Sequence, residues 1–74
     1  MKVWEGVIDE IYDCAVERSG SYEGILTVTH RPTGKTILTK GVTLSYNAIF
    51  GPDVSDVNAW AEMSIDAIDA GKHD

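Results

Sequence analysis

The sequence is poor in the residues that build catalytic and metal sites: it has one cysteine and two histidines. A single cysteine, Cys14, cannot form a disulfide within the chain, which is typical of a reducing cytosol. Cys14 with the distant His30 and His73 cannot supply a zinc site at any usual spacing. No glycine-rich phosphate-binding motif occurs either. We therefore expect no enzyme activity, no metal and no cofactor, with Cys14 buried and His30 exposed at a strand end.

Basic residues are also scarce, since 6 Lys and Arg stand against 12 Asp and Glu, for a net charge of −6. Binding to nucleic-acid phosphates or to anionic membranes needs Lys and Arg, so this balance argues against both. No apolar run approaches the roughly 18 residues of a membrane span, and no leader pattern opens the chain. The sequence predicts a cytoplasmic protein without direct nucleic-acid or membrane contact.

The length of 74 residues, with 43% hydrophobic and 24% charged residues, predicts one small globular domain. Residues 2–18 show a helical pattern, in which apolar side chains recur at i, i+3 and i+4 while acids fill the opposite arc. The apolar set is Val3, Trp4, Val7, Ile8, Ile11, Tyr12 and Ala15. Gly6 would cost this helix about 1 kcal/mol.

Residues 24–46 are rich in β-branched residues, which predicts strands at 24–30, 35–39 and 42–46. Turns are expected at 31–34 and at Lys40-Gly41, although one longer second strand with a bulge at Gly41 is the alternative. A second helix is predicted at 54–70, with Asp53 or Ser55 at its start.

The expected fold is therefore an α+β domain of order α-β-β-β-α, a three-stranded antiparallel meander with both helices on one face. In element order alone it resembles a double-stranded-RNA-binding domain. Those domains hold phosphates with lysines at the start of the second helix. This chain has Pro52-Asp53-Val54-Ser55-Asp56 there, so the resemblance implies no RNA binding.

Two acidic stripes and one apolar helix flank are the candidate partner-binding residues. In the first predicted helix the acids follow one another at i+4, where each like-charge neighbour costs about 0.2–0.5 kcal/mol. Such a stripe is either a solvated face or a ridge that meets a positive groove on a partner. The apolar flank either caps the core or forms a contact patch. The candidates are Glu5, Asp9, Asp13 and Glu17, then Glu62, Asp66 and Asp69, then Trp60 and Met63.

The function predicted first is that of a small inhibitor or decoy. It would bind a protein with a basic surface, such as a nucleic-acid-handling complex, by offering carboxylates where phosphates would lie. Small acidic proteins of phages and mobile elements act in this way against host defences, anti-CRISPR proteins among them, and the analogy rests on size and charge alone. The alternative is a non-catalytic adaptor that docks through Trp60. A homodimer is also expected, because it would bury area that one small core lacks.

Overall fold

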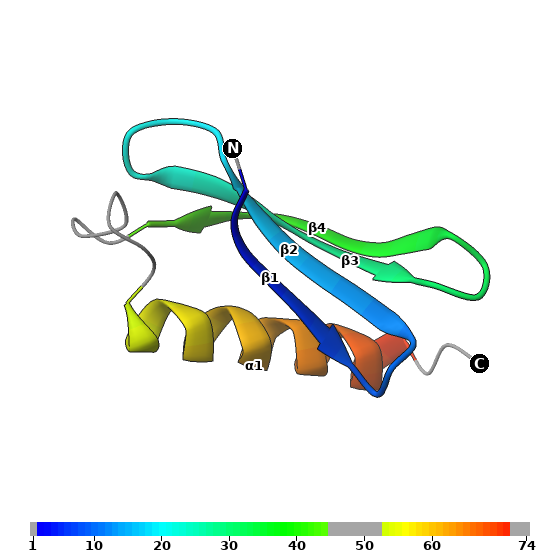
Figure 1. The fold of residues 1–74 in the computed structure, drawn as a ribbon. Coiled ribbons are helices and arrows are strands. Elements are labelled where there is room, and N and C mark those ends of the chain that lie inside the picture. The colour runs from blue at the N-terminus through cyan, green and yellow to red at the C-terminus, as the bar shows by residue number, and fades with distance from the viewer. Residues whose placement is uncertain (1, 45–52, 72–74) are drawn as a thin grey trace.

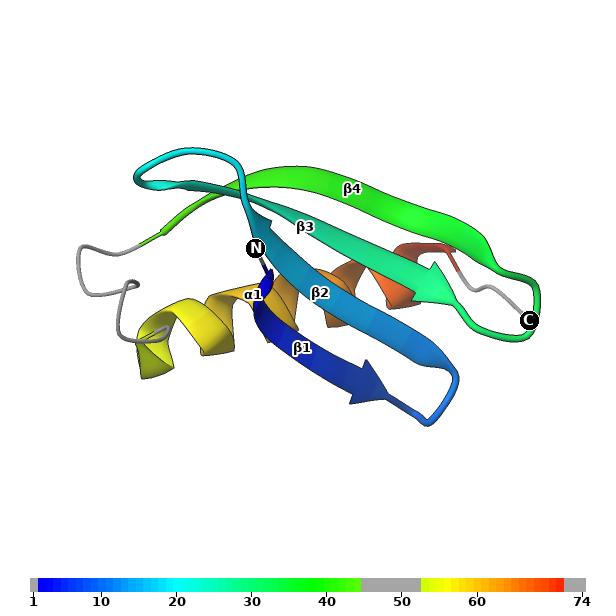
Figure 2. The same ribbon diagram turned by 45° about the horizontal axis from the view of Figure 1, so that its top comes forward.

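A computed structural model describes residues 2–44 and 53–71, which form a four-stranded antiparallel sheet and one helix (Figure 1). The elements are β1 (Lys2–Ile8), β2 (Tyr12–Arg18), β3 (Glu23–His30), β4 (Lys35–Thr43) and α1 (Val54–Gly71). The sheet order β1-β2-β3-β4 is an up-and-down meander with β1 and β4 at its edges. The helix lies along one face of the sheet, and the described residues leave the other face uncovered (Figures 1 and 2).

The predicted helix at 2–18 is wrong, because these residues form the hairpin of β1 and β2. Trp4 and Ile8 face α1, and the inward position between them is Gly6. A Cβ on Gly6 would lie 3.0 Å from the Trp4 ring, so the ring occupies that place. The next outward position is Val7, which is 54% exposed. Because Gly6 takes an inward position and Val7 an outward one, apolar residues of β1 do not alternate with period two. The spacing that remains resembles that of a helix.

The hairpin turns at a pair of residues that gave no turn signal in the sequence. Asp9 and Glu10 have φ values of 53° and 64°, and the Ile11 N–H donates to the Ile8 carbonyl at 3.2 Å. Positive φ at both central residues is the mark of a type I′ turn, which prefers Asn-Gly. With two strands in place of the first helix, the α-β-β-β-α order and its outline resemblance to RNA-binding domains both fall away.

The remaining elements lie close to their predicted places, with one difference. β3 and α1 coincide with the predicted strand at 24–30 and helix at 54–70. The predicted strands at 35–39 and 42–46 are wrong as separate strands, since β4 runs through Lys40-Gly41 without a turn. The irregular step in the ladder lies between Val28 and Thr29, not at Gly41. Residues 45 and 46 lie outside the described residues.

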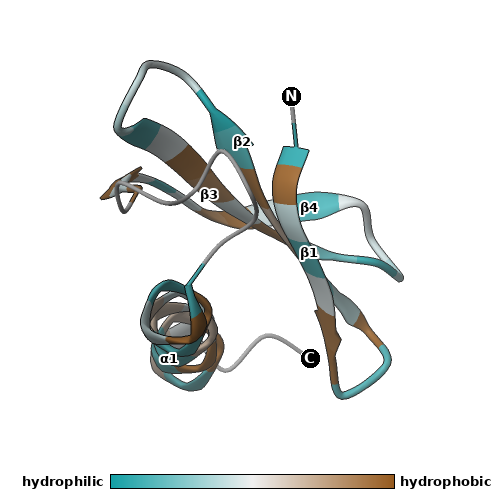
Figure 3. Ribbon diagram, turned by 60° about the vertical axis from the view of Figure 1, so that its left-hand side comes forward, coloured by the Kyte–Doolittle hydropathy of each residue, from teal (hydrophilic) through white to brown (hydrophobic). Residues whose placement is uncertain are grey.

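The core lies between α1 and the covered face of the sheet (Figure 3). Trp60 of α1 is 2% exposed, and its ring centroid lies 5.9 Å from that of Trp4. Ser64, also buried, satisfies its hydroxyl by donating to the Trp60 carbonyl at 2.8 Å. The buried hydrophobic residues are Tyr12, Cys14, Val16, Leu26, Val28, Val42, Leu44 and Trp60.

His30 is buried, at 4% exposure, so the expectation of an exposed strand-end residue is wrong. It continues the inward alternation of Leu26 and Val28 to the end of β3. Its ring stacks at a tilt beside Tyr12, 5.2 Å between centroids, and its Nδ1 lies 2.9 Å from the Thr33 hydroxyl. His73 lies outside the described residues. No helix in the described part of the chain is long and apolar enough to cross a membrane.

The turn of the first hairpin gives a stability prediction. Glu10→Gly should raise the free energy of unfolding by about 1 kcal/mol, because an L side chain pays roughly 1–2 kcal/mol at positive φ and glycine's extra folding entropy offsets part of that gain. Urea denaturation followed by tryptophan fluorescence measures it. As the opposite control, Gly34→Ala, at a φ of 72°, should lower the free energy by about 1 kcal/mol. An unchanged midpoint for Glu10→Gly would contradict the turn assignment.

Candidate functional site

The sheet face turned away from α1, here called the open face, carries the side chains that alternate with the core residues. The strand register places Asp13, Ala15 and Glu17 of β2 beside Thr29, Thr27 and Ile25 of β3 in that order. β1 adds Lys2, Glu5 and Val7, and β4 adds Thr36, Thr39, Gly41 and Thr43, opposite Thr29, Thr27, Ile25 and Glu23. Threonines and charged residues dominate this face, so the exposed aliphatic side chains of Val7 and Ile25 are exceptions on it.

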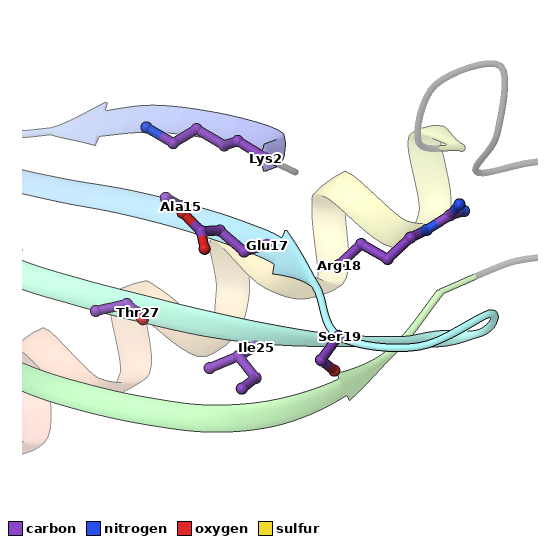
Figure 4. Close-up of a pocket in the computed structure, with 7 residues that line it drawn as sticks. All are labelled: Lys2, Ala15, Glu17, Arg18, Ser19, Ile25 and Thr27. Carbon is purple, nitrogen blue, oxygen red and sulfur yellow. The ribbon is translucent and has the colours of Figure 1, made fainter.

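Two shallow hollows adjoin each other at the end of the open face near the β2–β3 turn. The first has a volume of about 550 Å³ (Figure 4), and its lining residues are Lys2, Ala15, Glu17, Arg18, Ser19, Ile25 and Thr27. The second has a volume of about 450 Å³, and its lining residues are Ser19, Glu23, Gly24, Ile25, Gly41, Val42 and Thr43. Ile25 and Ser19 line both hollows, so Ile25 stands between them.

The space around Ile25 arises from the small residues next to it. Ile25 pairs with Gly41 of β4, and a Cβ built on Gly41 would meet no atom within 4 Å. On β2, Glu17 faces Ile25, and Ala15, diagonal to Ile25, is the smallest side chain along the first hollow. Ile25, the third residue of β3, is consequently 41% exposed, and a residue with a side chain at position 41 would cover part of it.

Opposite charges partly neutralise one another on the open face. Lys2 Nζ lies 2.8 Å from Glu5 Oε2. This hydrogen bond and charge pair lower the pKa of Glu5 and raise that of Lys2, to which the nearby charge of Glu17 adds. Arg31 Nε lies 3.6 Å from Asp13 Oδ1.

Glu17 and Glu23, the two carboxylates next to Ile25, make no ion pair with any residue in 2–44 or 53–71. Glu17 faces Ile25 directly across the β2–β3 ladder, and Glu23 precedes Ile25 by two residues on β3. The Arg18 side chain extends away from the hollow beyond the end of β2 (Figure 4). Its buried Nε has no hydrogen-bond partner in the described part of the chain.

The first predicted acidic stripe is thus partly assembled, although not on a helix. A spacing of four is also a multiple of the strand period, so Asp13 and Glu17 share one face of β2, and Glu5 joins them through pairing with β2. Asp9 lies in the turn instead. The structure adds Glu23, Ile25 and Gly41, which the sequence did not single out, because Ile25 was only part of a predicted strand and Gly41 part of a predicted turn.

The second predicted stripe and the apolar flank lie elsewhere. Glu62, Asp66 and Asp69 are exposed on the side of α1 that faces away from the sheet, so the two stripes do not merge. Trp60 is buried in the core and Met63 packs against the same cluster, partly buried. Neither residue offers an exposed contact patch in this structure.

Cys14 is the one thiol in the chain, and it lies in the core at 1% exposure, as expected. Burial raises its pKa, an effect that a hydrogen bond with Ser64 only partly opposes. A raised pKa keeps the thiol protonated at neutral pH, and the thiolate is the reactive form. Among residues 2–44 and 53–71 no group of His, Cys, Asp and Glu is placed to hold a metal ion.

Comparisons of the chain with protein-family models, with curated protein sequences and with solved structures find no match.

Two glycines test the geometry of the two sheet faces, Gly41 on the open face and Gly24 on the covered face. Gly41→Thr should raise the free energy of unfolding by about 0.5–1 kcal/mol, because the added side chain enters open space and glycine is unfavourable inside a strand. Gly24→Ala should lower it by about 1–3 kcal/mol, since its Cβ would lie 3.0 Å from Val16 and 3.1 Å from the Glu17 carbonyl. Chemical denaturation measures both, and a destabilised Gly41→Thr would show that position 41 is not open.

Burial of Cys14 gives a kinetic prediction. A thiol-specific reagent should modify the native protein only through transient unfolding, so the rate should follow the equilibrium population of the open form. The stabilised Glu10→Gly variant should then react about fivefold more slowly than the parent protein, as about 1 kcal/mol implies. Reaction of the native protein at the rate of an unfolded thiol would contradict this.

Proposed function

We propose that the protein is a non-catalytic, cytoplasmic protein-binding domain that acts as an inhibitor or decoy of a partner with a basic surface, such as a nucleic-acid-handling complex. The observation that carries the proposal is the clustering of four carboxylates, Glu5, Asp13, Glu17 and Glu23, on one uncovered sheet face. Adjacent strands lie about 4.8 Å apart, and alternate residues of one strand about 6.8 Å apart. The face therefore presents closely spaced carboxylates, as a nucleic-acid backbone presents phosphates, and two of them, Glu17 and Glu23, make no ion pair in the described part of the chain.

The far side of the molecule supports the same partner chemistry. The segment Val54–Gly71 has four acids and no Lys or Arg, and no basic residue lies in its last turn. Asp69, near the C-terminal end, meets the negative end of the helix dipole, which is unfavourable by about 0.3–1 kcal/mol. Helix stability therefore does not explain the acidic residues of α1. Long-range attraction of a basic partner, which acts over about one Debye length, does explain them.

The adaptor hypothesis relied on Trp60 as an exposed anchor. Trp60 is 2% exposed and belongs to the core of this domain, so no observation favours that alternative.

A binding experiment tests the proposal. The tagged protein is used to capture partners from nuclease-treated lysate of its source cells, the captured protein is purified, and its dissociation constant is measured over a range of salt concentrations. We expect affinity to fall steeply with salt, because exposed charges are screened over about 10 Å at 0.1 M. The double variant Glu17→Lys and Glu23→Lys should weaken binding about tenfold or more, at roughly 1 kcal/mol per surface pair.

The matched control is Asp66→Lys with Asp69→Lys, which changes the net charge equally on the outward side of α1. It should alter the association rate but leave most of the affinity in place. A captured partner whose affinity is independent of salt, or one that is lost only with the α1 variant, would contradict docking through the open face. An empty capture would contradict the decoy function itself.

A further inference from the structure

We propose that the paired hollows beside Ile25 receive an aliphatic side chain from an extended, basic segment of the partner, with Lys or Arg on either side of it bound by Glu17 and Glu23. This inference rests on the proposed function and specifies the chemistry of the segment that docks.

The apolar part of the site is an aliphatic side chain left uncovered by its neighbours. Ile25 is 41% exposed and stands between hollows of about 550 and 450 Å³. Gly41, its direct partner on β4, supplies no side chain, and no atom fills the space where one would be. Removing such a side chain from water on binding is favourable in proportion to the apolar area covered. An aliphatic group laid in the Gly41 gap would contact Ile25 from the side that this chain leaves empty.

Neither backbone conformation nor packing among the described residues requires glycine at position 41. Its φ is not in the left-handed region, unlike that of Gly34. No neighbour approaches it closely, unlike Gly24, whose surroundings leave no room for a Cβ. A strand interior disfavours glycine, so its presence there costs stability without improving the packing. A partner side chain that occupies the gap on binding would explain why glycine is present despite its cost to stability.

The polar part of the site selects the charge of the occupant. Glu17 and Glu23 flank Ile25 on two sides and make no ion pair with a described residue, whereas Glu5 and Asp13 have Lys2 and Arg31. A purely apolar segment would cover both carboxylates without a counter-charge, which is costly. Cations next to the aliphatic side chain avoid that cost, and acidic segments are repelled.

The arrangement of the hollows favours an extended segment. Together they reach from Lys2 on β1 to Thr43 on β4, which is three interstrand steps, or about 14 Å. An extended chain projects every second side chain to one side at intervals of about 6.8 Å, so three alternate side chains span that distance. A partner segment with a cation at position i, an aliphatic residue at i+2 and a second cation at i+4 therefore has the length and spacing of the two hollows.

The test uses a capped heptapeptide with leucine at its centre and arginine two residues away on either side, titrated into the full-length, isotopically labelled protein. Amide chemical shifts should change around Ile25, Thr27 and Gly41 and not on α1. Serine in place of the central leucine should weaken binding about tenfold, which corresponds to 1.4 kcal/mol. Glutamate in place of both arginines should abolish it.

Gly41→Thr is the decisive variant, because it fills the gap in a protein expected to be at least as stable as the parent. It should weaken the leucine peptide about tenfold and leave the serine peptide unchanged. Equal binding of the leucine and serine peptides would overturn the aliphatic anchor and leave the salt-dependent acidic docking standing. Shift changes confined to α1, or no binding of the leucine peptide at millimolar concentration, would overturn the inference whatever partner the capture experiment yields.

Discussion

The packing of the Trp60 ring against Trp4 and the covered face of the sheet fixes the rest of this structure. One large side chain from α1 meets Val16, Leu26 and Val42 from three strands, together with Leu44 just after β4, in one cluster. The covered face accommodates it through glycine: Gly6 lies under the Trp4 ring, and Gly24 leaves room for Val16 and Leu44, which a Cβ there would approach to 3.0 and 3.2 Å. Once these positions face the helix, strand alternation decides which side chains face outward.

A four-stranded sheet with one helix in its described part leaves its second face uncovered, and such a face is normally polar. The threonine pairs at Thr27–Thr39 and Thr29–Thr36 follow this rule, since they combine strand preference with a hydroxyl. The row at Ile25 departs from it by combining an exposed aliphatic side chain with a glycine beside it. This exception is confined to the row of Ile25 and Gly41. It says more about binding than the net charge does, because it marks one place on the acidic face where a partner would make contact.

Elements with local sequence signals were predicted correctly. Elements whose form depends on tertiary placement were not. β3 and α1 follow from β-branched residues and from helical periodicity respectively. The hairpin at 2–18 was missed because Gly6 replaced an inward side chain, Val7 stood outward, and Asp9-Glu10 is an unusual pair for positive φ. The acids Glu5, Asp13 and Glu17 were still found together, because a spacing of four suits both a helix face and a strand face. Ile25 and Gly41 could not be singled out, since an exposed isoleucine and a buried one look alike in sequence.

The change from helix to sheet also changes what the acidic stripe means energetically. On a helix every like-charge neighbour at i+4 would be a cost with no local compensation. On the sheet, Lys2 reaches Glu5 within β1 at 2.8 Å, and the β3–β4 turn brings Arg31 to Asp13 at 3.6 Å. The fold therefore pairs Glu5 and Asp13 directly with cations, whereas Glu17 and Glu23, beside Ile25 of β3, make no ion pair in the described part of the chain. Carboxylates without an ion pair and an exposed aliphatic side chain therefore lie side by side, and a partner that supplies both a cation and an aliphatic group binds both.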